Sequence, residues 1–261
     1  MGNIMLNCLS QKSLRSQDLL TYYRYICEQP LTIVDVETTG CTADYCRVIE
    51  VSVLSASLAD GIRSQVTYLI NPLVPVPGLI TNLTGISQSM VDDAPLPREV
   101  WPQCHSLLQT GVLTAHNLPF DYAFLQSEFA HQDISFSRPP SDRFCTLALA
   151  RLLLPELRSR SLPALVQNFN FDVGESHRAE ADTLACWLLA RQLLRQIRNT
   201  ADEDLLDMFA HQWISTDGAA TLLGCSESEV GIVMKQAGLP SKSYKRSGGR
   251  YRRGVVESLL S

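Results

Sequence analysis

The stretch that decides the fold runs from Leu31 to Gly40 and reads LTIVDVETTG. Its apolar start is typical of a buried strand, and the period of two along a strand puts Asp35 and Glu37 on the same side. Two neighbouring carboxylates repel and raise each other's pKa unless a cation lies between them. The pattern therefore indicates a divalent-metal site at a strand end. The alternative is a solvated strand end before the Thr-Thr-Gly turn.

The length and composition are those of an ordinary globular protein. The 261 residues suffice for one large domain or for a medium and a small one, and 45% of them are hydrophobic. No window approaches the roughly 18 apolar residues of a membrane span, and the N-terminus shows no export signal. The eight cysteines lack Cys-x-x-Cys spacing, which argues against a zinc site and a disulfide framework. We therefore expect a cytoplasmic location.

The net charge of -5 conceals an asymmetry along the chain. From Trp213 to the end, seven Lys and Arg face four acidic residues, a balance of +3. The rest holds 15 basic and 23 acidic residues, a balance of -8. An acidic body with a basic end is typical of a metal-binding catalytic part joined to a polyanion-binding part.

Strand and helix patterns alternate along most of the chain. A helix is predicted over residues 16–28, and we expect its apolar face to pack on the sheet. The pattern predicts strands at 31–37, 47–58, 62–70 and 111–116, a short strand with a helix at 144–154, and helices near 99–109, 118–129, 161–169 and 178–198. The first three strands form an antiparallel meander, and the whole is an α/β core with a mixed sheet.

Four acidic residues are placed where they converge at one edge of such a sheet. Asp35, Glu37, Asp121 and Asp182 each lie at a strand end or a helix start. Hard oxygen ligands select Mg²⁺ or Mn²⁺, and two such ions about 4 Å apart can promote phosphodiester hydrolysis. His177 precedes Asp182 by five residues, and its neutral imidazole is suited to take a proton from the attacking water.

The motifs IVDVETTG, LTGIS, TAHNLPFDYAFL and HRAEAD resemble, in order and spacing, those of DEDDh 3′-to-5′ exonucleases, the family of the proofreading epsilon subunit of bacterial DNA polymerase III. The resemblance covers about residues 31–194. It implies a five-stranded ribonuclease-H-like sheet, two Mg²⁺ or Mn²⁺ ions, and release of nucleoside 5′-monophosphates from nucleic-acid 3′ ends. Asp35 would bridge both metals, Glu37 and Asp182 would complete one shell, Asp121 would hold the other metal, and His177 would be the general base.

The same resemblance implies a set of residues near the substrate, namely Thr38, Thr39, Asn117, Phe120 and Arg178. Thr38 and Thr39 would contact the terminal nucleotide. Arg178 would meet a phosphate or stand in solvent at a helix start. Cys41 departs from the family, which commonly has a leucine there that wedges against the terminal base, so we expect a looser grip on the 3′ nucleotide.

The C-terminal residues predict a small DNA-binding module. After an acidic bridge at 199–207, residues 216–239 read as two short helices around a tight turn, and a basic hairpin with glycines 248 and 249 follows. This resembles winged helix-turn-helix domains of the excisionase and MerR type. The expected DNA contacts are Lys245, Arg246, Arg250, Arg252 and Arg253. The alternative is a solvated hairpin on a protein-docking module.

We therefore predict a helical lead at 1–30, a DEDDh exonuclease domain at 31–200 and a winged helix-turn-helix domain at 208–261. Nucleic acid is the expected partner, with single-stranded 3′ ends at the active site and DNA, the favoured substrate, also at the C-terminal domain. An exonuclease of RNA or short oligonucleotides with the same fold is one alternative. A DNA-binding regulator with an inactive exonuclease scaffold is another. The linker has no convincing sliding-clamp peptide, which counts against a polymerase-associated proofreader.

Overall fold

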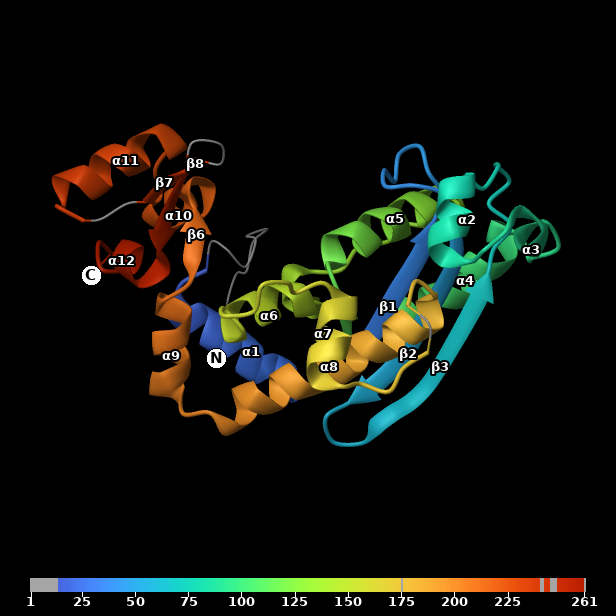
Figure 1. Ribbon diagram of the computed structural model, residues 1–261, viewed down its shortest axis with the longest axis horizontal. Coiled ribbons are helices and arrows are strands. Elements are labelled where there is room, and N and C mark those ends of the chain that lie inside the picture. The colour runs from blue at the N-terminus through green and yellow to red at the C-terminus, as the bar shows by residue number, and fades with distance from the viewer. Residues whose placement is uncertain (1–13, 175, 240–241, 245–247, 261) are drawn as a thin grey trace. The chain divides into compact units, whose positions relative to one another are not determined.

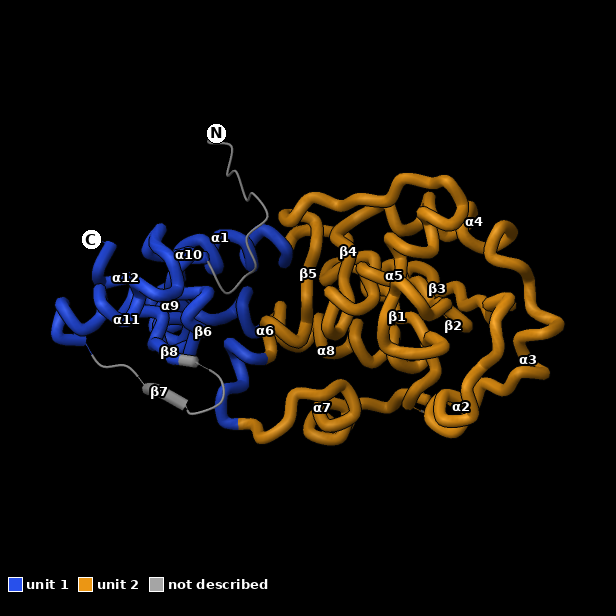
Figure 2. The backbone as a smooth tube through the Cα atoms, turned by 90° about the horizontal axis from the view of Figure 1, so that it is seen from above, with its two compact units in different colours: residues 1–27, 151–156, 196–261 blue, residues 28–150, 157–195 orange. Residues whose placement is uncertain are grey.

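The computed structural model describes residues 14–174, 176–239, 242–244 and 248–260 (Figure 1). The chain forms two compact units, coloured separately in Figure 2. The sheet unit consists of residues 28–150 and 157–195, and the terminal unit consists of residues 1–27, 151–156 and 196–261. The chain passes from the first unit to the second within the long helix that begins at Ala179.

A five-stranded mixed sheet forms the centre of the sheet unit, in the order β3-β2-β1-β4-β5. The strands are β1 (Leu31–Thr38), β2 (Val48–Ser57), β3 (Gly61–Leu69), β4 (Val112–Ala115) and β5 (Arg143–Cys145). The pairs β1–β2 and β2–β3 are antiparallel, and the pairs β1–β4 and β4–β5 are parallel. The predicted meander and mixed sheet are thereby confirmed.

Helices follow the strands in the sheet unit. They are α2 (Gly78–Thr84), α3 (Gln88–Asp92), α4 (Pro97–Leu108), α5 (Leu118–Ala130), the 3-10 helix η2 (Pro140–Asp142), α6 (Thr146–Leu153), α7 (Leu162–Phe169) and α8 (Ala179–Asn199). The last residues of α6 and of α8 belong to the terminal unit.

Alternation along β1 gives the sheet two different faces. Val34 and Val36 lie in an apolar core that also holds Trp101 of α4 and Phe124 of α5. The residues between them, Asp35 and Glu37, therefore point to the opposite face. On that face α8 begins, since the backbone N–H of Ala179 donates to Glu50 of β2 at 2.8 Å. Figure 1 shows α8 in front of β2.

A glycine allows β4 to lie beside β1. Gly111 has a φ of 53°, and a Cβ there would lie 2.6 Å from the carbonyl oxygen of Pro30. The next residue, Val112, donates its N–H to that same oxygen at 2.9 Å, which begins the parallel pairing with β1. This close approach fixes where β4 begins beside β1, and the four residues of β4 then lead to the start of α5.

The terminal unit contains a helical layer and a small sheet. Its elements are α1 (Ser16–Cys27), α9 (Asp202–Ala210), β6 (Trp213–Ser215), α10 (Thr216–Leu223), α11 (Glu227–Gln236), β7 (Lys242–Tyr244), β8 (Gly248–Arg252) and α12 (Arg253–Glu257). The strands form an antiparallel sheet in the order β6-β8-β7. Ala219, Val230, Tyr251 and Val256 are among the residues of its apolar core.

Helix α1 packs in the terminal unit and not on the five-stranded sheet, where we expected it. The ring of Tyr23 lies 6.1 Å from that of Phe209 on α9. Arg24 pairs with Asp202 at 2.5 Å and also donates to two carbonyl oxygens at the end of α8 and beyond it. Most of the predicted acidic bridge belongs to the helix α9. Its residues Leu205 and Phe209, four apart and therefore on one face, are both buried.

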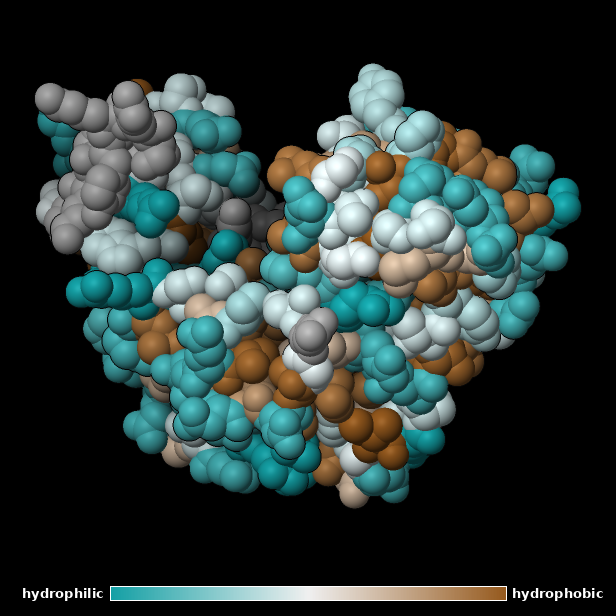
Figure 3. All heavy atoms as spheres, turned by 45° about the vertical axis from the view of Figure 1, so that its right-hand side comes forward, coloured by the Kyte–Doolittle hydropathy of each residue, from teal (hydrophilic) through white to brown (hydrophobic). Residues whose placement is uncertain are grey.

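The surface mixes polar and apolar side chains. None of the described helices is both long and apolar enough to cross a membrane. On the face shown in Figure 3 hydrophobic residues are interspersed with hydrophilic ones. The most exposed of the large apolar side chains are Tyr45 and Leu79, at 87% and 78% exposure.

Candidate active site

The end of β1 supplies two of the predicted acidic residues. Asp35 and Glu37 are both partly buried on one face of the sheet. In the pairing of β1 with β2, Glu37 stands opposite Glu50 and Asp35 stands opposite Ser52. Glu50 is 1% exposed, so a third carboxyl group lies in the sheet beside the first two.

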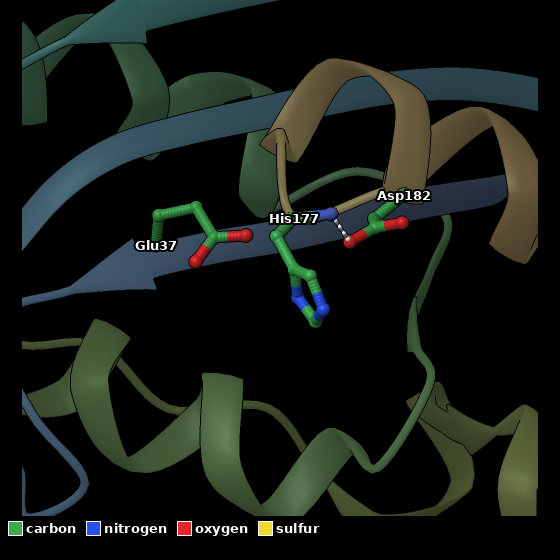
Figure 4. A group of neighbouring side chains, drawn as sticks. All are labelled: Glu37, His177 and Asp182. Carbon is green, nitrogen blue, oxygen red and sulfur yellow. Dashed lines mark hydrogen bonds between the residues drawn. The ribbon is translucent and has the colours of Figure 1, made fainter. Parts of the chain in front are cut away.

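The segment that precedes α8 brings His177 and Asp182 to the same place. One ligand atom from each of Glu37, His177 and Asp182 lies within 4.8 Å of the others. Figure 4 shows the imidazole ring of His177 between the two carboxyl groups. His177 has a φ of 65°, and its backbone N–H donates to Asp182 Oδ2 at 3.0 Å. This bond fixes the turn that points the imidazole toward the carboxyl groups.

Asp121 comes from the first turn of α5. The helix starts after Asn117, whose φ is 75°, and has Pro119 in its first turn. The Asp121 carboxyl is 3% exposed and its Oδ1 accepts from the backbone N–H of Val36 at 3.3 Å. Since Val36 lies between Asp35 and Glu37, this bond holds Asp121 against the same stretch of β1. Asp35 and Asp121 thus lie beside the group formed by Glu37, His177 and Asp182 and are not members of it.

The crowding of these carboxyl groups raises their pKa values. Burial, followed by repulsion from Asp121, Asp182, Glu37 and Glu50, raises the pKa of Asp35 well above its usual value. Burial, with repulsion from Asp182 and Glu50, raises the pKa of Glu37 to about 7. Burial raises the pKa of Asp121 to about 8 against the opposing effect of its backbone hydrogen bonds, and burial also raises the pKa of Asp182.

The donor set fits divalent metal ions. Within the described part of the chain, no Lys or Arg forms an ion pair with Asp35, Glu37, Asp121 or Asp182. Carboxylate oxygens are the ligands that Mg²⁺ and Mn²⁺ prefer, and a cation among them would remove the repulsion that raises their pKa values. The arrangement is therefore chemically suited to hold divalent cations.

The residues expected near the substrate shape the loops around the site. Thr38 donates its hydroxyl to the carbonyl oxygen of Gly40 at 2.6 Å, and Thr39 Oγ1 accepts from the backbone N–H of Arg47 at 2.9 Å. Both threonine side chains are buried and fix the turn after β1. Asn117 occupies the N-cap position of α5 without a capping hydrogen bond from its side chain, and the ring of Phe120 lies 4.9 Å from that of Phe124. Cys41 is exposed beside this turn.

Arg178 forms an ion pair, and its partner Glu50 was missed in the sequence. Its Nη2 donates to Glu50 Oε1 at 2.7 Å and its Nε to Glu50 Oε2 at 3.2 Å, while the Arg178 side chain remains 41% exposed. The guanidinium is therefore neither a solvated helix-start group nor wholly available to a phosphate. The signal that could have pointed to Glu50 was a single charged residue inside the stretch VIEVSVL.

The five basic residues expected to contact DNA fall into three groups. Lys245 and Arg246 lie outside the described residues. Arg250 is exposed, and the guanidinium of Arg252 lies 4.2 Å from the centre of the Trp213 ring. Arg253 is fully buried, so its guanidinium does not reach the surface.

The contacts of Arg253 explain why it departs from the expectation. It donates to Gln212 Oε1 from Nη2 at 2.6 Å and to the carbonyl oxygen of Leu14. We therefore exclude Arg253 from the expected phosphate contacts and assign it to the core of the terminal unit. Charge in the sequence gave no indication that this one arginine of the basic run is turned inward.

Comparison with known proteins identifies relatives for the sheet unit. The exonuclease family model, RNase_T, matches residues 32–189. The PolC-type DNA polymerase III of Oceanobacillus iheyensis is 33% identical over 180 residues, and that of Bacillus subtilis is 30% identical over 183 residues. These alignments cover 66% and 70% of this chain but only 12% of each polymerase, so the chain spans a small part of the length of those relatives.

Solved exonuclease structures share the fold. Exonuclease X in complex with 5′-overhanging duplex DNA has a TM-score of 0.50 at 24% identity and covers 68% of this chain and 98% of its own. A structure of exonuclease I has a TM-score of 0.58 at 18% identity and covers 69% of this chain and 43% of its own. The five-stranded sheet is consistent with the ribonuclease-H-like type that the sequence predicts. Because the family model covers more than half of the 261 residues, the chain belongs to the exonuclease family, with residues 32–189 as its exonuclease domain.

Proposed function

We propose that this chain is a metal-dependent exonuclease of the DEDDh type that removes nucleotides from DNA 3′ ends and releases nucleoside 5′-monophosphates. The observation that carries this proposal is the meeting of Glu37, His177 and Asp182 within 4.8 Å, beside the carboxyl groups of Asp35 and Asp121. Crowded buried carboxyl groups cost folding free energy unless cations bind them. In an inactive scaffold nothing would offset this loss of folding free energy, which disfavours the inactive-regulator alternative.

Asp35, Glu37, Asp121 and Asp182 are the residues that would hold two Mg²⁺ or Mn²⁺ ions. Bound divalent cations would stabilise the negative charge that develops on the phosphodiester and ease the ionisation of the attacking water. The fit rests on the donor chemistry. Burial, with repulsion among the carboxyl groups, raises the pKa values of Asp35 and Glu37, and Arg178 offsets only part of this at Glu37.

His177 would act as the general base. An imidazole nitrogen lies within 4.8 Å of a carboxylate oxygen of Glu37 and of Asp182, and the backbone N–H of His177 donates to Asp182. A neutral imidazole accepts a proton from water near pH 7. As that proton leaves, the water oxygen bonds to phosphorus and the bond from phosphorus to the O3′ of the preceding nucleotide breaks. The O3′ takes a proton from solvent, which leaves a 3′-hydroxyl on the shortened strand, and His177 returns its proton to solvent.

DNA is the substrate that the comparisons favour. The relatives with the PolC-type name are DNA polymerases, and the related exonuclease X structure contains DNA. Hydrolysis of RNA or short oligonucleotides on the same fold remains the second candidate, because discrimination of a 2′-hydroxyl depends on pocket shape.

The terminal unit would hold DNA through a winged helix-turn-helix. Helices α10 and α11 are separated by three residues, and the second begins with a capping box in which the Ser226 N–H donates to Glu229 Oε2 at 2.8 Å. Strands β7 and β8 follow as the expected wing, on which Arg250 is exposed. We place the chain in a reducing, cytoplasmic compartment, where the described cysteines, which form no disulfide with one another, would stay reduced.

One incubation series tests the proposal. Single-stranded DNA and RNA oligonucleotides of one sequence, labelled at the 5′ end, are incubated with the full chain in Mg²⁺, Mn²⁺ or EDTA, and the products are separated. We expect metal-dependent shortening from the 3′ end with release of nucleoside 5′-monophosphates, faster on DNA, and no turnover by Asp35→Ala.

Glu180→Gln is the matched control, because Glu180 is an exposed carboxylate in the first turn of α8. It should keep full activity. Faster shortening of RNA would favour the second candidate. Duplex binding without cleavage of either strand in any metal would favour the regulator, and full activity of Asp35→Ala in EDTA would remove the catalytic assignment.

A further inference from the structure

Glu50 is a buried carboxylate with no role in the reaction described above. It lies in β2 directly opposite Glu37 and is 1% exposed. Its Oε1 accepts from Arg178 Nη2 at 2.7 Å, and its Oε2 accepts from Arg178 Nε at 3.2 Å and from the backbone N–H of Ala179 at 2.8 Å. One carboxylate thus holds three donors from two consecutive residues of a segment 128 residues away.

The residues it holds stand immediately beside the proposed base. Arg178 follows His177, and Ala179 is the first residue of α8, which carries Asp182 in its first turn. The segment also has an internal hydrogen bond, from the His177 N–H to Asp182, which closes the turn between these two residues. The conformation at His177 is left-handed, which is unfavourable for a residue with a side chain and persists only where neighbouring contacts hold it.

We propose that Glu50 is a positioning residue of the exonuclease site: it fastens the segment from His177 to Asp182 to β2 opposite Glu37, and so sets the separation between Glu37 and both residues. This inference rests on the proposed function. The physical reason is that Glu37 and Asp182 belong to different elements, and Glu50 is the charged group that joins the strand pair β1–β2 to the start of α8. A bidentate carboxylate–guanidinium pair fixes orientation as well as distance.

The chain offers a matched control in Glu128 of α5. It is also 1% exposed and accepts from Arg47 Nε and Nη2, both at 2.9 Å, from the Val48 N–H at 3.0 Å and from Trp101 Nε1 at 3.1 Å. It joins α5 to α4 and to the start of β2, two helical turns from Asp121. Glu128→Gln therefore removes a buried charge with at least as many hydrogen bonds, at a place that does not touch the segment 177–182.

The first measurement needs no substrate. Mn²⁺ binding to the full chain is measured by calorimetry for the wild type, Glu50→Gln and Glu128→Gln, with unfolding followed in parallel. We expect Glu50→Gln to weaken Mn²⁺ binding by about 10- to 100-fold, the usual effect of removing a group that orients metal-binding residues. Glu128→Gln should lower stability to a similar degree and change Mn²⁺ binding by less than about 3-fold. Equal weakening by both variants would show that Glu50 is only structural.

The second measurement is a double-mutant cycle on hydrolysis of a 3′-terminal nucleotide. Glu50→Gln should lower kcat by about 10- to 100-fold with little change in KM, because displacement of a reacting group by about 1 Å has that effect. Because Glu50 positions Asp182 as well as His177, the double variant with His177→Ala, assayed at saturating Mn²⁺, should be slowed by clearly less than the product of the two single effects. Multiplication of the two effects would refute the inference. The effects of Glu128→Gln and His177→Ala on kcat should multiply when the two substitutions are combined.

Two further arms keep the inference testable. Arg178→Gln removes the partly exposed partner of Glu50 and replaces Glu50→Gln as the test if that variant does not fold. Arg178→Lys should be more active than Arg178→Gln, because lysine keeps the positive charge but not the bidentate contact. If the wild type hydrolyses no substrate, the proposed function fails, while the Mn²⁺ comparison still decides the inference. If the wild type and His177→Ala behave as proposed but the cycle multiplies, the inference alone fails.

Discussion

Binding of Mn²⁺ to the proposed metal site should release protons at mildly acidic pH. Without metal, burial raises the pKa of Glu37 from 4.5 to about 7 and that of Asp121 from 3.8 to about 8. At pH 6 the first carboxyl is then about nine-tenths protonated and the second almost completely so. A divalent cation binds only the ionised form, so binding at pH 6 should release about two protons from this pair. Asp35, whose pKa burial also raises, should add to that number.

The assay is calorimetric titration of the full chain with MnCl₂ in two buffers that differ in ionisation enthalpy. The difference between the two apparent enthalpies gives the number of protons released when two Mn²⁺ ions bind. At pH 9 the same two carboxyl groups retain only about 0.1 proton, so the release should almost vanish. Glu37→Gln should remove about one proton at pH 6. Glu180→Gln should remove none, because Glu180 is exposed on α8.

Two results would refute the reasoning. Release of fewer than about 0.5 proton at pH 6, with binding otherwise measured, would show that the carboxyl groups are already ionised in the metal-free protein. An equal release at pH 6 and pH 9 would show that the protons come from groups other than these carboxyls.

The same protons set the sign of the effect of pH on stability. Between about pH 4.5 and 7 the folded chain holds a proton on Glu37 that the unfolded chain has lost. The free energy of unfolding in EDTA should therefore fall as pH rises through this window, by up to about 3 kcal/mol for this one group, and saturating Mn²⁺ should remove the fall. Denaturant titrations of the sheet unit's transition at pH 5, 6, 7 and 8 would measure it.

Four further substitutions have defined outcomes. His177→Ala should lower kcat by about 10² to 10⁴ and remove the acidic limb of the pH–rate profile with Mn²⁺ affinity nearly unchanged; lost Mn²⁺ binding would make His177 a ligand instead. Arg253→Ala should destabilise the terminal unit by about 2–4 kcal/mol in thermal unfolding, because buried acceptors lose their donor; an unchanged melting temperature would contradict the observed burial. Arg250→Ala should reduce the slope of log K against log salt for duplex DNA by about 0.9, and an unchanged slope would point to another partner. Gly111→Ala should destabilise the sheet unit by about 1–3 kcal/mol in denaturant, since its φ is 53° and its new Cβ would lie 2.6 Å from Pro30; a neutral change would mean that the β1–β4 pairing can shift.

Local patterns in the sequence were sufficient for the elements of the sheet unit. The helix predicted over 16–28 is α1 at Ser16–Cys27, and the three strands of the meander have the expected order and direction. Such features depend on neighbours in the chain, namely apolar periodicity and turn residues. The packing partner of α1 does not depend on neighbours in the chain. An amphipathic face shows that the helix packs against another element, but it does not identify that element.

Acidic composition hid one helix. The stretch 199–207 reads as a solvated bridge because three of its residues at the start of α9 are Asp202, Glu203 and Asp204. Carboxylates at a helix N-terminus are favourable, however, and Leu205 with Phe209 forms an apolar pair at a spacing of four. Both signals were present, and the second becomes decisive only when Tyr23 is known to face that pair.

The site was predictable where chemistry requires particular residues and was not where packing supports them. Asp35, Glu37 and His177 were found because metal binding and proton transfer restrict the choice of side chain and its spacing. Glu50 was not, because its donors lie about 128 residues away and its strand is buried on both faces. Its interaction depends on the register of β2 against the start of α8, which is a tertiary property.

The terminal unit shows why the predicted boundaries at residues 30 and 208 do not separate its parts. Ser16, in the first turn of α1, donates its backbone N–H and hydroxyl to Glu257 of α12 at 2.6 to 3.0 Å. The buried guanidinium of Arg253 donates to the carbonyl oxygen of Leu14. Removal of the N-terminal helix would leave that charge with fewer acceptors in an apolar surrounding, which is among the costliest changes a small core can undergo. The two ends of the chain therefore stabilise each other, and any DNA affinity of the β7–β8 hairpin depends on residues at the opposite terminus.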